Sequence, residues 1–422
     1  MNSSRRISIV IALLTLLLAP MVQTEAQNST ASPYSMFGVG ILTPKEDAAM
    51  AAMGHTGVAL SSNEWVNISN PAGISKLDSL SFYFNIQVKA FYTHLKNEFN
   101  MSSVYSGNID AITMAFRTKK WWCMAIGYAP YSAVGYEISD SKNILGSYDS
   151  YSVSYKGSGG LSQAYWTNAF TLFNHFTIGA NVSVLWGSIT KREVAQFYSS
   201  IGGEDITNER KYTMNNMFFE FGAQWDFNLG HNNFRFGVRY NDKRSLHSSY
   251  DQTISNNIDK ELMHDDVTSF NDKFQVPRSY AAGFTYSRGR WLATTDFTYN
   301  EWGDIPNAKF EERTHFKDNY SVNAGVQYSA GKYGDPFYKR IRYRFGGFYR
   351  TDYLKLRQVD LDEKGVTLGI TLPIGNSPNS VTISYEQSVR GQDVSNLVKE
   401  TTKCFKIAFN VKETWFMKSK FD

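Results

Sequence analysis

The fold is decided by the stretch Leu80-Ser81-Phe82-Tyr83-Phe84-Asn85-Ile86-Gln87-Val88-Lys89-Ala90. Apolar residues occupy every second position, and the positions between them are mostly polar. A period of two places the apolar side chains on one face of a β-strand. The same alternation returns in residues 176–186, 219–227, 366–372 and 405–411. The sequence therefore predicts many strands, each with one apolar and one polar face.

About fourteen such segments follow residue 78, and their connections alternate between short and long, as in transmembrane β-barrels. Two regions depart from the pattern. The connection 330–340 is long for a turn, and residues 147–156 also alternate and could extend a strand above the membrane. We expect strands at 79–95, 108–117, 121–138, 163–173, 176–189, 212–228, 234–250, 277–287, 291–303, 318–329, 341–353, 364–373, 379–388 and 403–411. The long loops are expected at 139–162, 190–211, 251–276, 304–317 and 389–402.

The composition favours a barrel over a bundle of membrane helices. The 422 residues are 42% hydrophobic and 15% aromatic, the mean hydropathy is −0.36 and the net charge is +4. This charge is too small to indicate nucleic-acid binding. In hydrocarbon each unpaired backbone group costs several kcal/mol, so a spanning sheet must close on itself. The predicted fold class is all-β: a transmembrane antiparallel β-barrel of about 14 strands, occupying residues 79–411.

Residues 1–26 are predicted to be a cleaved signal peptide. Arg5 and Arg6 are basic, residues 7–19 are apolar, and Thr24-Glu25-Ala26 precedes Gln27. This order is typical of a secretory signal. An uncleaved N-terminal membrane anchor is the alternative. An exported barrel of this kind is expected in the outer membrane of a Gram-negative cell.

Residues 27–78 do not alternate like membrane strands, and we expect them to form a hatch, or plug, inside the barrel lumen. Glycines at positions 38, 40, 54 and 57 would let its backbone adopt unusual conformations. The apolar residues of the segment are hypothesised to bind an apolar ligand; they are Phe37, Val39, Ile41, Met50 and Met53.

Charged residues on the polar faces of the strands are expected to point into the lumen. Structural ion pairs are the expected use for them, and a substrate path is the alternative. They are Glu220, Asp226, Arg235, Arg239, Asp296, Arg342, Arg344, Arg350 and Glu386.

No catalytic constellation and no histidine spacing for a metal site is present in the sequence, so neither an enzyme nor a cofactor is predicted. Asp360 and Asp362 resemble a calcium loop only faintly, and a hairpin turn is the preferred interpretation. Cys123 and Cys404 fall on strands that are not neighbours, so both are treated as free thiols.

Four motifs follow one another along the chain: Asn70-Pro71-Ala72 (the hatch turn), Gly157-Ser158-Gly159-Gly160-Leu161, Val276-Pro277-Arg278 and Asp296-x-x-Tyr299-x-x-Trp302. In this order and spacing they resemble the FadL-type family of outer-membrane transporters for hydrophobic compounds, in a version common in Bacteroidota and related also to PorV-like barrels. The resemblance spans nearly the whole mature chain. It implies a fourteen-stranded barrel, an N-terminal hatch and lateral release at a kinked third strand. The residues 412–422, a short periplasmic tail, depart from the family pattern.

The third predicted strand has its own reason to be kinked. Pro130 cannot donate a ladder hydrogen bond and does not fit a regular central strand. A local opening around Gly127 and Pro130 is therefore predicted. The alternative places Pro130 in a loop above the membrane.

The predicted function is outer-membrane transport of a hydrophobic compound, such as a long-chain fatty acid. The alternative is a docking or scaffold barrel in an outer-membrane protein secretion or assembly machine. The expected partners are the lipid bilayer, an apolar small molecule or lipid and, for the alternative, other outer-membrane or periplasmic proteins.

Overall fold

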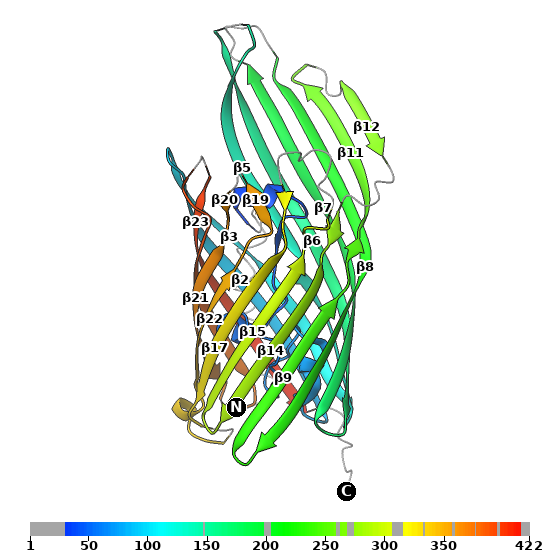
Figure 1. Cartoon of the computed structure of the whole chain (residues 1–422), viewed down its shortest axis with the longest axis vertical. Coiled ribbons are helices and arrows are strands. Elements are labelled where there is room, and N and C mark those ends of the chain that lie inside the picture. Colours follow the sequence, from blue (N-terminus) through cyan, green and yellow to red (C-terminus); the bar gives the residue numbers. More distant parts are fainter. Residues whose placement is uncertain are drawn as a thin grey trace.

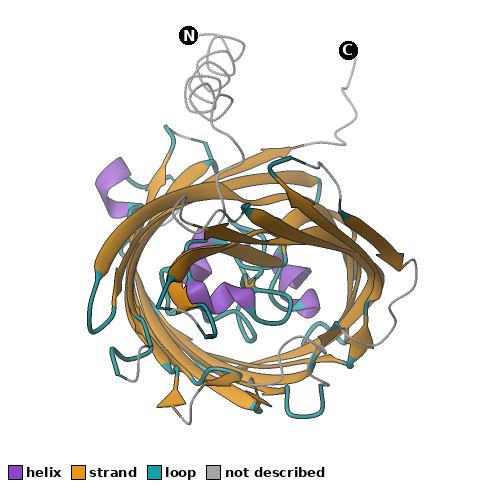
Figure 2. Cartoon of the chain, turned by 90° about the horizontal axis from the view of Figure 1, so that it is seen from above, coloured by secondary structure: helices purple, strands orange, loops and turns teal. Residues whose placement is uncertain are grey.

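A computed structural model describes residues 30–146, 148–197, 204–258, 262–267, 274–305, 315–331, 334–356, 359–375, 377–394 and 397–414. Within them the chain forms a closed antiparallel barrel of 14 strands around residues 30–80 (Figure 1, Figure 2). The barrel closes because the last strand pairs with the first from Ser81↔Thr414 to Lys96↔Lys399. The predicted fold class is confirmed. The predicted signal peptide lies outside the described residues.

Each barrel strand pairs with the next along the chain, apart from short insertions. The strands are β2 (Ser81–Lys96), β3 (Met101–Lys119), β4 (Trp122–Pro130), β6 (Ser150–Leu172), β7 (Phe176–Phe197), β8 (Ile206–Leu229), β9 (Asn232–Asn241), β14 (Arg278–Arg288), β15 (Trp291–Glu301), β17 (Asn319–Ser329), β18 (Arg342–Arg350), β21 (Glu363–Pro373), β22 (Ser380–Arg390) and β23 (Lys399–Thr414). The last strand begins four residues earlier and ends three residues later than predicted. The rest of the predicted tail, residues 415–422, lies outside the described residues.

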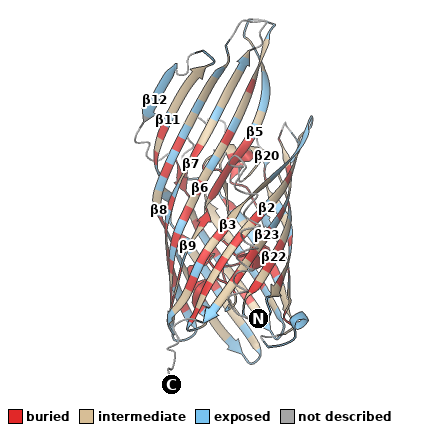
Figure 3. Ribbon diagram, turned by 180° about the vertical axis from the view of Figure 1, so that it is seen from behind, coloured by how far each residue is buried: buried red, intermediate tan, exposed pale blue. Residues whose placement is uncertain are grey.

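The barrel is polar inside and apolar outside. In β2 the side chains of Asn85, Gln87 and Lys89 are buried, whereas large apolar side chains such as Ile178 and Phe221 are exposed on the outer face of other strands. Figure 3 shows the resulting alternation of buried and more exposed residues along the strands. This arrangement is typical of a barrel whose outer face meets lipid.

Two of the predicted long loops are largely β-strand, which corrects the assignment of 139–162 and 190–211. Strands β6, β7 and β8 continue past the rest of the barrel into a tall extension (Figure 1). The possible strand extension at 147–156 is found, since β6 begins at Ser150. The continuation of β7 and β8 through 190–211 was missed because both faces of these stretches carry polar side chains, so their apolar alternation is weak. It also contains β5 (Ser132–Asn143), β11 (His247–Asn256) and β12 (Met263–Val267).

Two predicted strands are interrupted. The segment 121–138 contains β4 and β5, which are separated at Tyr131. The segment 234–250 contains β9, β10 (Arg244–Ser245) and part of β11; β10 pairs with β13 (Gln275–Val276) instead of continuing the barrel ladder. A three-stranded sheet is formed by β16 (His315–Phe316), β19 (Leu354–Leu356) and β20 (Val359–Asp360). The turn after β17 holds a short helix, η4 (Phe337–Lys339), which accounts for part of its length.

We call residues 30–80 the luminal segment, because they lie inside the ring of strands (Figure 2). Its short helices are capped by side chains: Asp47 accepts a hydrogen bond from the Ala49 N–H at 2.7 Å, and Asn70 accepts one from the Ala72 N–H at 3.0 Å. Among the described residues no helix is long and apolar enough to cross a membrane. The elements of the segment are η2 (Pro33–Met36), β1 (Ile41–Leu42), α2 (Ala48–Ala51) and η3 (Pro71–Lys76).

Wall glycines let the luminal segment approach the barrel at backbone distance. A Cβ on any of them would collide with the segment, and at most of them it would meet its backbone. Gly54 of the segment makes the reciprocal approach, since its own Cβ would meet the Gly347 oxygen at 2.5 Å. With φ of 70° it also has a backbone conformation that favours glycine. We call the seven wall glycines the glycine belt; they are Gly179, Gly222, Gly237, Gly283, Gly325, Gly346 and Gly369.

Wall side chains satisfy the backbone of the segment at the same level. Thr367 accepts a hydrogen bond from the Gly54 N–H at 2.9 Å, and Asn323 donates one to the Gly54 oxygen at 2.6 Å. Asp296 accepts from the N–H groups of Gly57 and Val58, at 2.6 and 2.8 Å. Irregular backbone buried inside a barrel needs such partners. The lower part of the luminal segment is therefore held closely on several sides.

Candidate functional site: the central cavity and the break beside it

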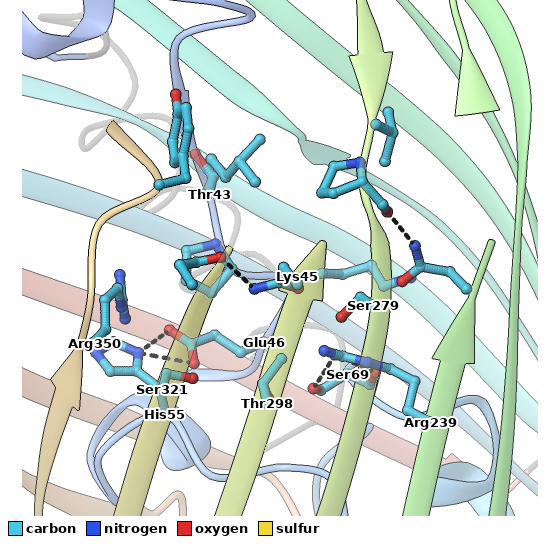
Figure 4. Close-up of a pocket in the computed structure, with 18 of the residues that line it drawn as sticks. Thr43, Lys45, Glu46, His55, Ser69, Arg239, Ser279, Thr298, Ser321 and Arg350 are labelled. Atoms are coloured by element: carbon cyan, nitrogen blue, oxygen red, sulfur yellow. Dashed lines mark hydrogen bonds and ion pairs between the residues drawn. The ribbon is translucent and has the colours of Figure 1, made fainter. Parts of the chain in front are cut away.

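A cavity of about 290 Å³ lies above the glycine belt (Figure 4). On one side it is bounded by residues 41–46, which we call the strap, and on the other by the barrel wall. Its lining contains five acidic residues and five basic ones. The acidic residues are Glu46, Glu220, Asp296, Asp352 and Glu363, and the basic ones are Lys45, His55, Arg239, Arg350 and Arg390. A lining of this kind suits a polar group better than a hydrocarbon chain.

Most of these charges are paired. Lys45 contacts Glu220, Arg350 lies 3.3 Å from Glu363, and Arg390 donates to Asp352 at 2.8 Å. In register, Arg350, Glu363, Arg390 and Glu400 stand opposite one another on four successive strands. Opposite charges in directly facing positions stabilise neighbouring strands. The sequence-based expectation of ion pairs in the lumen therefore describes most of the charged wall residues, including Arg235 with Asp226 and Arg342 with Glu64.

His55 connects the luminal segment to the wall. Its Nδ1 lies 2.8 Å from Glu46 and its Nε2 lies 3.1 Å from Glu386 on β22. Burial would lower the pKa of His55, but the two carboxylates outweigh burial and raise it to about 9. Burial acts against ionisation of Glu46 too, yet the charges of His55 and Lys406 hold its pKa below the usual value. His55 also has a positive φ of 64°, which is uncommon for a residue other than glycine.

Lys406 carries this network to β3. Its ammonium lies 2.6 Å from Glu46 and 3.0 Å from Asp110, and Lys89 contacts the same Asp110 at 2.7 Å. Asp110 is the extra residue of a β-bulge, because Gln87 pairs with Ala111 and Val88 with Ile109. A bulge redirects a side chain, and here the Asp110 side chain is only 1% exposed. The network thus links the luminal segment to β2, β3, β22 and β23.

The barrel ladder is interrupted directly beyond this bulge. β3 pairs with β4 as far as Ile112↔Tyr128. Farther along, β5 pairs with β6 and with β1, and not with β3, within the described residues. We call this interruption the ladder break. The strap covers the open edge of β5 through Ile41↔Ala133 and Leu42↔Ser132, and the Thr43 N–H donates to the Tyr131 oxygen at 2.9 Å.

A smaller cavity of about 150 Å³ adjoins the ladder break. It is lined by Phe91, Ser106 and Ala133, from β2, β3 and β5. It shares His55 and all strap residues except Lys45 with the central cavity, so the strap separates two neighbouring spaces. We call it the side cavity.

The five residues hypothesised to bind an apolar ligand do not gather around one space. Ile41 lines both cavities. Met50 and Met53 are fully buried in a cluster with Leu60 and Trp65, so they pack the core of the luminal segment. Val39 belongs to a different apolar cluster, with Leu185 and Tyr212 among its members. Phe37 packs against a third cluster, around Trp302 and Tyr353.

The predicted hatch turn is seated on the glycine belt. Asn70 donates to the Val58 oxygen at 2.6 Å and to the Val238 oxygen at 3.2 Å. A Cβ at Gly222 would collide with Asn70, and one at Gly179 would collide with Pro71 and Ala72. These three residues therefore fix the segment to β7, β8 and β9.

Pro130 ends β4, still paired with Ser162 of β6, and it lies in the wall rather than in a loop. A Cβ at Gly127 would collide with the Ile112 oxygen and with Tyr165, whose hydroxyl lies 2.6 Å from that of Thr113. Gly127 therefore lets β3 and Tyr165 approach β4 closely just below the ladder break. Pro130 is the last residue of β4 before the ladder break.

Sequence reasoning identified only Ile41 of the strap, and it missed Glu46, Lys89, Asp110 and Lys406. A charged residue inside a strand pattern was an available signal for Asp110, because Ile109-Asp110-Ala111 interrupts the alternation. Nothing local marks Lys406 as its partner, since the two lie on strands from opposite ends of the chain.

Among the described residues no group of three or more His, Cys, Asp or Glu could hold a metal ion. Cys123 and Cys404 are free and buried.

Solved barrels of a FadL homologue and of toluene transporters have a fold similar to that of this chain. A FadL homologue from Pseudomonas aeruginosa has a TM-score of 0.62 and 12% identity, over 89% of this chain and 100% of that one. The toluene transporter TodX of Pseudomonas putida has a TM-score of 0.60 and 15% identity, over 90% and 100%. The toluene transporter TbuX of Ralstonia pickettii has a TM-score of 0.59 and 13% identity, over 90% and 99%.

The family is given by a second comparison. The family model described as BamG matches residues 5–422, and the chain belongs to the BamG family. No curated protein matches the chain. The FadL-type resemblance predicted from the sequence is therefore confirmed for the fold, and the family carries a different label.

Proposed function

We propose that the chain works in the outer membrane as a transporter for hydrophobic or amphiphilic compounds, such as a long-chain fatty acid, with lateral release through the ladder break. The observation that carries this proposal is that the side cavity adjoins the ladder break. The likeness in fold to FadL-type and toluene transporters supports it. Export by a cleaved signal peptide and a Bacteroidota-type origin remain part of the proposal.

In this proposal the strap is the gate. It is held by a two-residue pairing with β5 and by the ion pairs of Lys45 and Glu46 with the wall, whereas residues 52–72 lie against the glycine belt. Movement of the strap would join the central cavity to the side cavity. Ile41 and Phe37 would meet the ligand during passage, Val39 would support the strap, and Met50 and Met53 would stabilise the hatch behind it. Gly127 and Pro130 would keep the third strand kinked, and the turn Asn70-Pro71-Ala72 would keep the hatch in place.

A reversible lock on the strap tests the proposal. Leu42→Cys and Ser132→Cys place two thiols on directly paired residues, in a background with Cys123→Ser and Cys404→Ser. Cells that depend on this barrel should take up a fluorescent fatty acid when the pair is reduced and lose most of that uptake when it is oxidised. The pair Leu372→Cys with Val381→Cys, on β21 and β22, is the matched control. Equal uptake in both redox states of the strap pair would refute the gate.

A docking or scaffold barrel remains the second candidate, and the extension favours it. Strands β5–β8, β11 and β12 build a sheet well beyond the rest of the barrel (Figure 1). The charged lining of the central cavity also gives an apolar cargo few contacts. Purification in mild detergent separates the two candidates. A stoichiometric protein partner without any bound lipid favours docking, and a reproducibly bound lipid without a partner favours transport.

A further inference from the structure

The wall of the central cavity carries a set of polar groups that the protein itself leaves unused. Ser279 on β14, Thr298 on β15 and Ser321 on β17 line the cavity from three successive strands (Figure 4). Thr298 and Ser321 face each other in register. Within the described residues, no protein group forms a hydrogen bond with any of the three hydroxyls, whereas the neighbouring Asn300 and Asn319 bond to each other at 3.0 Å.

Two charged groups at the same cavity are only partly satisfied. Asp296 is 5% exposed; its Oδ2 accepts from the luminal segment, but its Oδ1 has no hydrogen-bond partner among the described residues. Arg239 donates from Nη1 to Ser69, at 3.2 Å to the backbone oxygen and 3.3 Å to the hydroxyl, while its buried Nε likewise has no partner there. The cavity is thus lined by three hydroxyls that can act as donor or acceptor, and by Asp296 and Arg239, each of which keeps one buried polar atom without a partner among the described residues.

The pattern of unused groups discriminates between ligand classes. A hydrocarbon would cover all five groups and pair none of them, which is unfavourable for each buried polar group. A carboxylate could pair with Arg239, but it would bring a second negative charge near Asp296. A ligand with several hydroxyls can donate to Asp296 and accept from Arg239 and the wall hydroxyls. The cavity of about 290 Å³ stands near the lower end of the usual range for ligand sites, which suits a group of about one sugar ring.

We propose that the central cavity is a binding site for a hydroxyl-rich, saccharide-type group, oriented by Ser279, Thr298 and Ser321 together with Arg239 and Asp296, all from the neighbouring wall strands β9, β14, β15 and β17. This chemistry is supplied by a free sugar or by the head group of a glycolipid. Binding of the sugar group does not depend on the proposed route. Only the glycolipid case rests on the proposed function, because its acyl chains would have to pass the strap and leave through the ladder break.

The test uses the full barrel in nanodiscs of phosphatidylethanolamine, so that no glycoside detergent competes. Methyl β-D-glucopyranoside is titrated calorimetrically, and retention of monoglucosyl diacylglycerol, added to the nanodiscs, is measured by native mass spectrometry. We expect one of these two probes to bind the wild type with a single site. Thr298→Val with Ser321→Ala should weaken that binding about tenfold or more, since each lost hydroxyl removes one hydrogen bond to the ligand.

The matched control is Ser384→Ala, a buried serine of β22 that does not line the central cavity and should bind as the wild type does. Folding of each variant is checked by heat-modifiable migration in gels. Binding of methyl glucopyranoside identifies a free-sugar site, and retention of the glycolipid alone identifies a head-group site. Absence of both, or binding that is unchanged in the double variant, overturns the proposal. In either of those cases, loss of uptake on oxidation of the Leu42→Cys and Ser132→Cys pair would still support the proposed transport.

Discussion

The luminal segment is held in two different ways. At the glycine belt its backbone lies against the backbone of the wall on many strands, and wall side chains such as Asn323 and Asp296 bond directly to it. At the ladder break the backbone of the strap pairs with β5 over two residues only, and its further contacts with the wall include the side-chain ion pairs of Lys45 with Glu220 and of Glu46 with Lys406. This difference shows how one segment can close the barrel lumen and still leave a route to the side. Its close backbone contacts with the wall need only be confined to the glycine belt.

The charged network joins the two regions, and its removal should have the largest effect. Lys406 bonds to Glu46 of the segment and to Asp110 of the bulge. Lys406→Met leaves two buried carboxylates with one partner fewer, and should lower the free energy of unfolding by about 3–5 kcal/mol. Urea titration in liposomes measures this loss.

Lys96→Met is the matched control for Lys406→Met. The ion pair of Lys96 with Asp393 has side chains that are 49% and 37% exposed. Such a pair contributes about 0–1 kcal/mol. A comparable loss in the two variants would show that the buried network does not hold the segment.

The glycine belt can be broken by a single methyl group. A Cβ at Gly346 would collide with the backbone of Met53 and Gly54, which cannot yield easily. Gly346→Ala should destabilise the folded barrel by about 1–3 kcal/mol and make its lumen leaky to small antibiotics. The adjacent Gly347→Ala is the control, because its Cβ would meet only the Gly365 oxygen at an ordinary 3.4 Å. Equal leakiness in both variants would contradict close packing at the belt.

The attachment of the segment should weaken as the pH rises. The folded-state pKa of His55 is raised from 6.5 to about 9. Its stabilising contribution is therefore fully present below pH 6.5 and is lost as the pH rises through about 9. Burial raises the pKa of Asp47 to about 6. Its contribution to stability therefore also decreases as the pH rises, but at a lower pH than that of His55. Glu46 has a lowered pKa, so its contribution is present above about pH 4.5 and fades in stronger acid.

This weakening can be measured by trypsin cleavage or by hydrogen exchange at constant temperature, with the rates corrected for the intrinsic effect of pH. Residues 41–60 should become more accessible between pH 6.5 and 9. His55→Asn should remove most of the change. A trend that is equal in the variant and the wild type would place the titrating group elsewhere.

The smallest expected effect is a difference in reaction rate between the thiols of Cys123 and Cys404. Both are buried, but Cys404 lines the side cavity, whereas Cys123 packs among Ala115, Ala125 and Ile74 at the level of the hatch. A small charged methanethiosulfonate should react slowly with Cys404 and more slowly still with Cys123. Single-cysteine variants, Cys123→Ser and Cys404→Ser, separate the two rates. Faster reaction of Cys123 would reverse the proposed order of access.

The barrel was predictable because its signal is local and repeated. Alternation in stretches such as 80–90 fixes strand and face together, and Pro130 marked the irregular third strand. The side cavity and the network were not predictable, because Asp110, Lys406 and Glu46 come from separate parts of the chain and meet only after closure. The apolar residues of the segment show a further limit of the sequence: Met50 and Met53 pack in a buried cluster, and hydrophobicity alone does not distinguish a core from a ligand site.

The most direct measurement is hydrogen exchange of the luminal segment in nanodiscs, resolved by mass spectrometry. At the belt, the amides of Gly54, Gly57 and Val58 bond to wall side chains, whereas the backbone N–H groups of the strap bond to the wall through the short pairing with β5 and the bond from Thr43 to Tyr131. Peptides from residues 53–60 should therefore exchange as slowly as the barrel strands, and peptides from the strap, residues 41–46, should exchange much faster. Exchange that is faster at the belt than in the strap would contradict a fixed belt and a releasable strap.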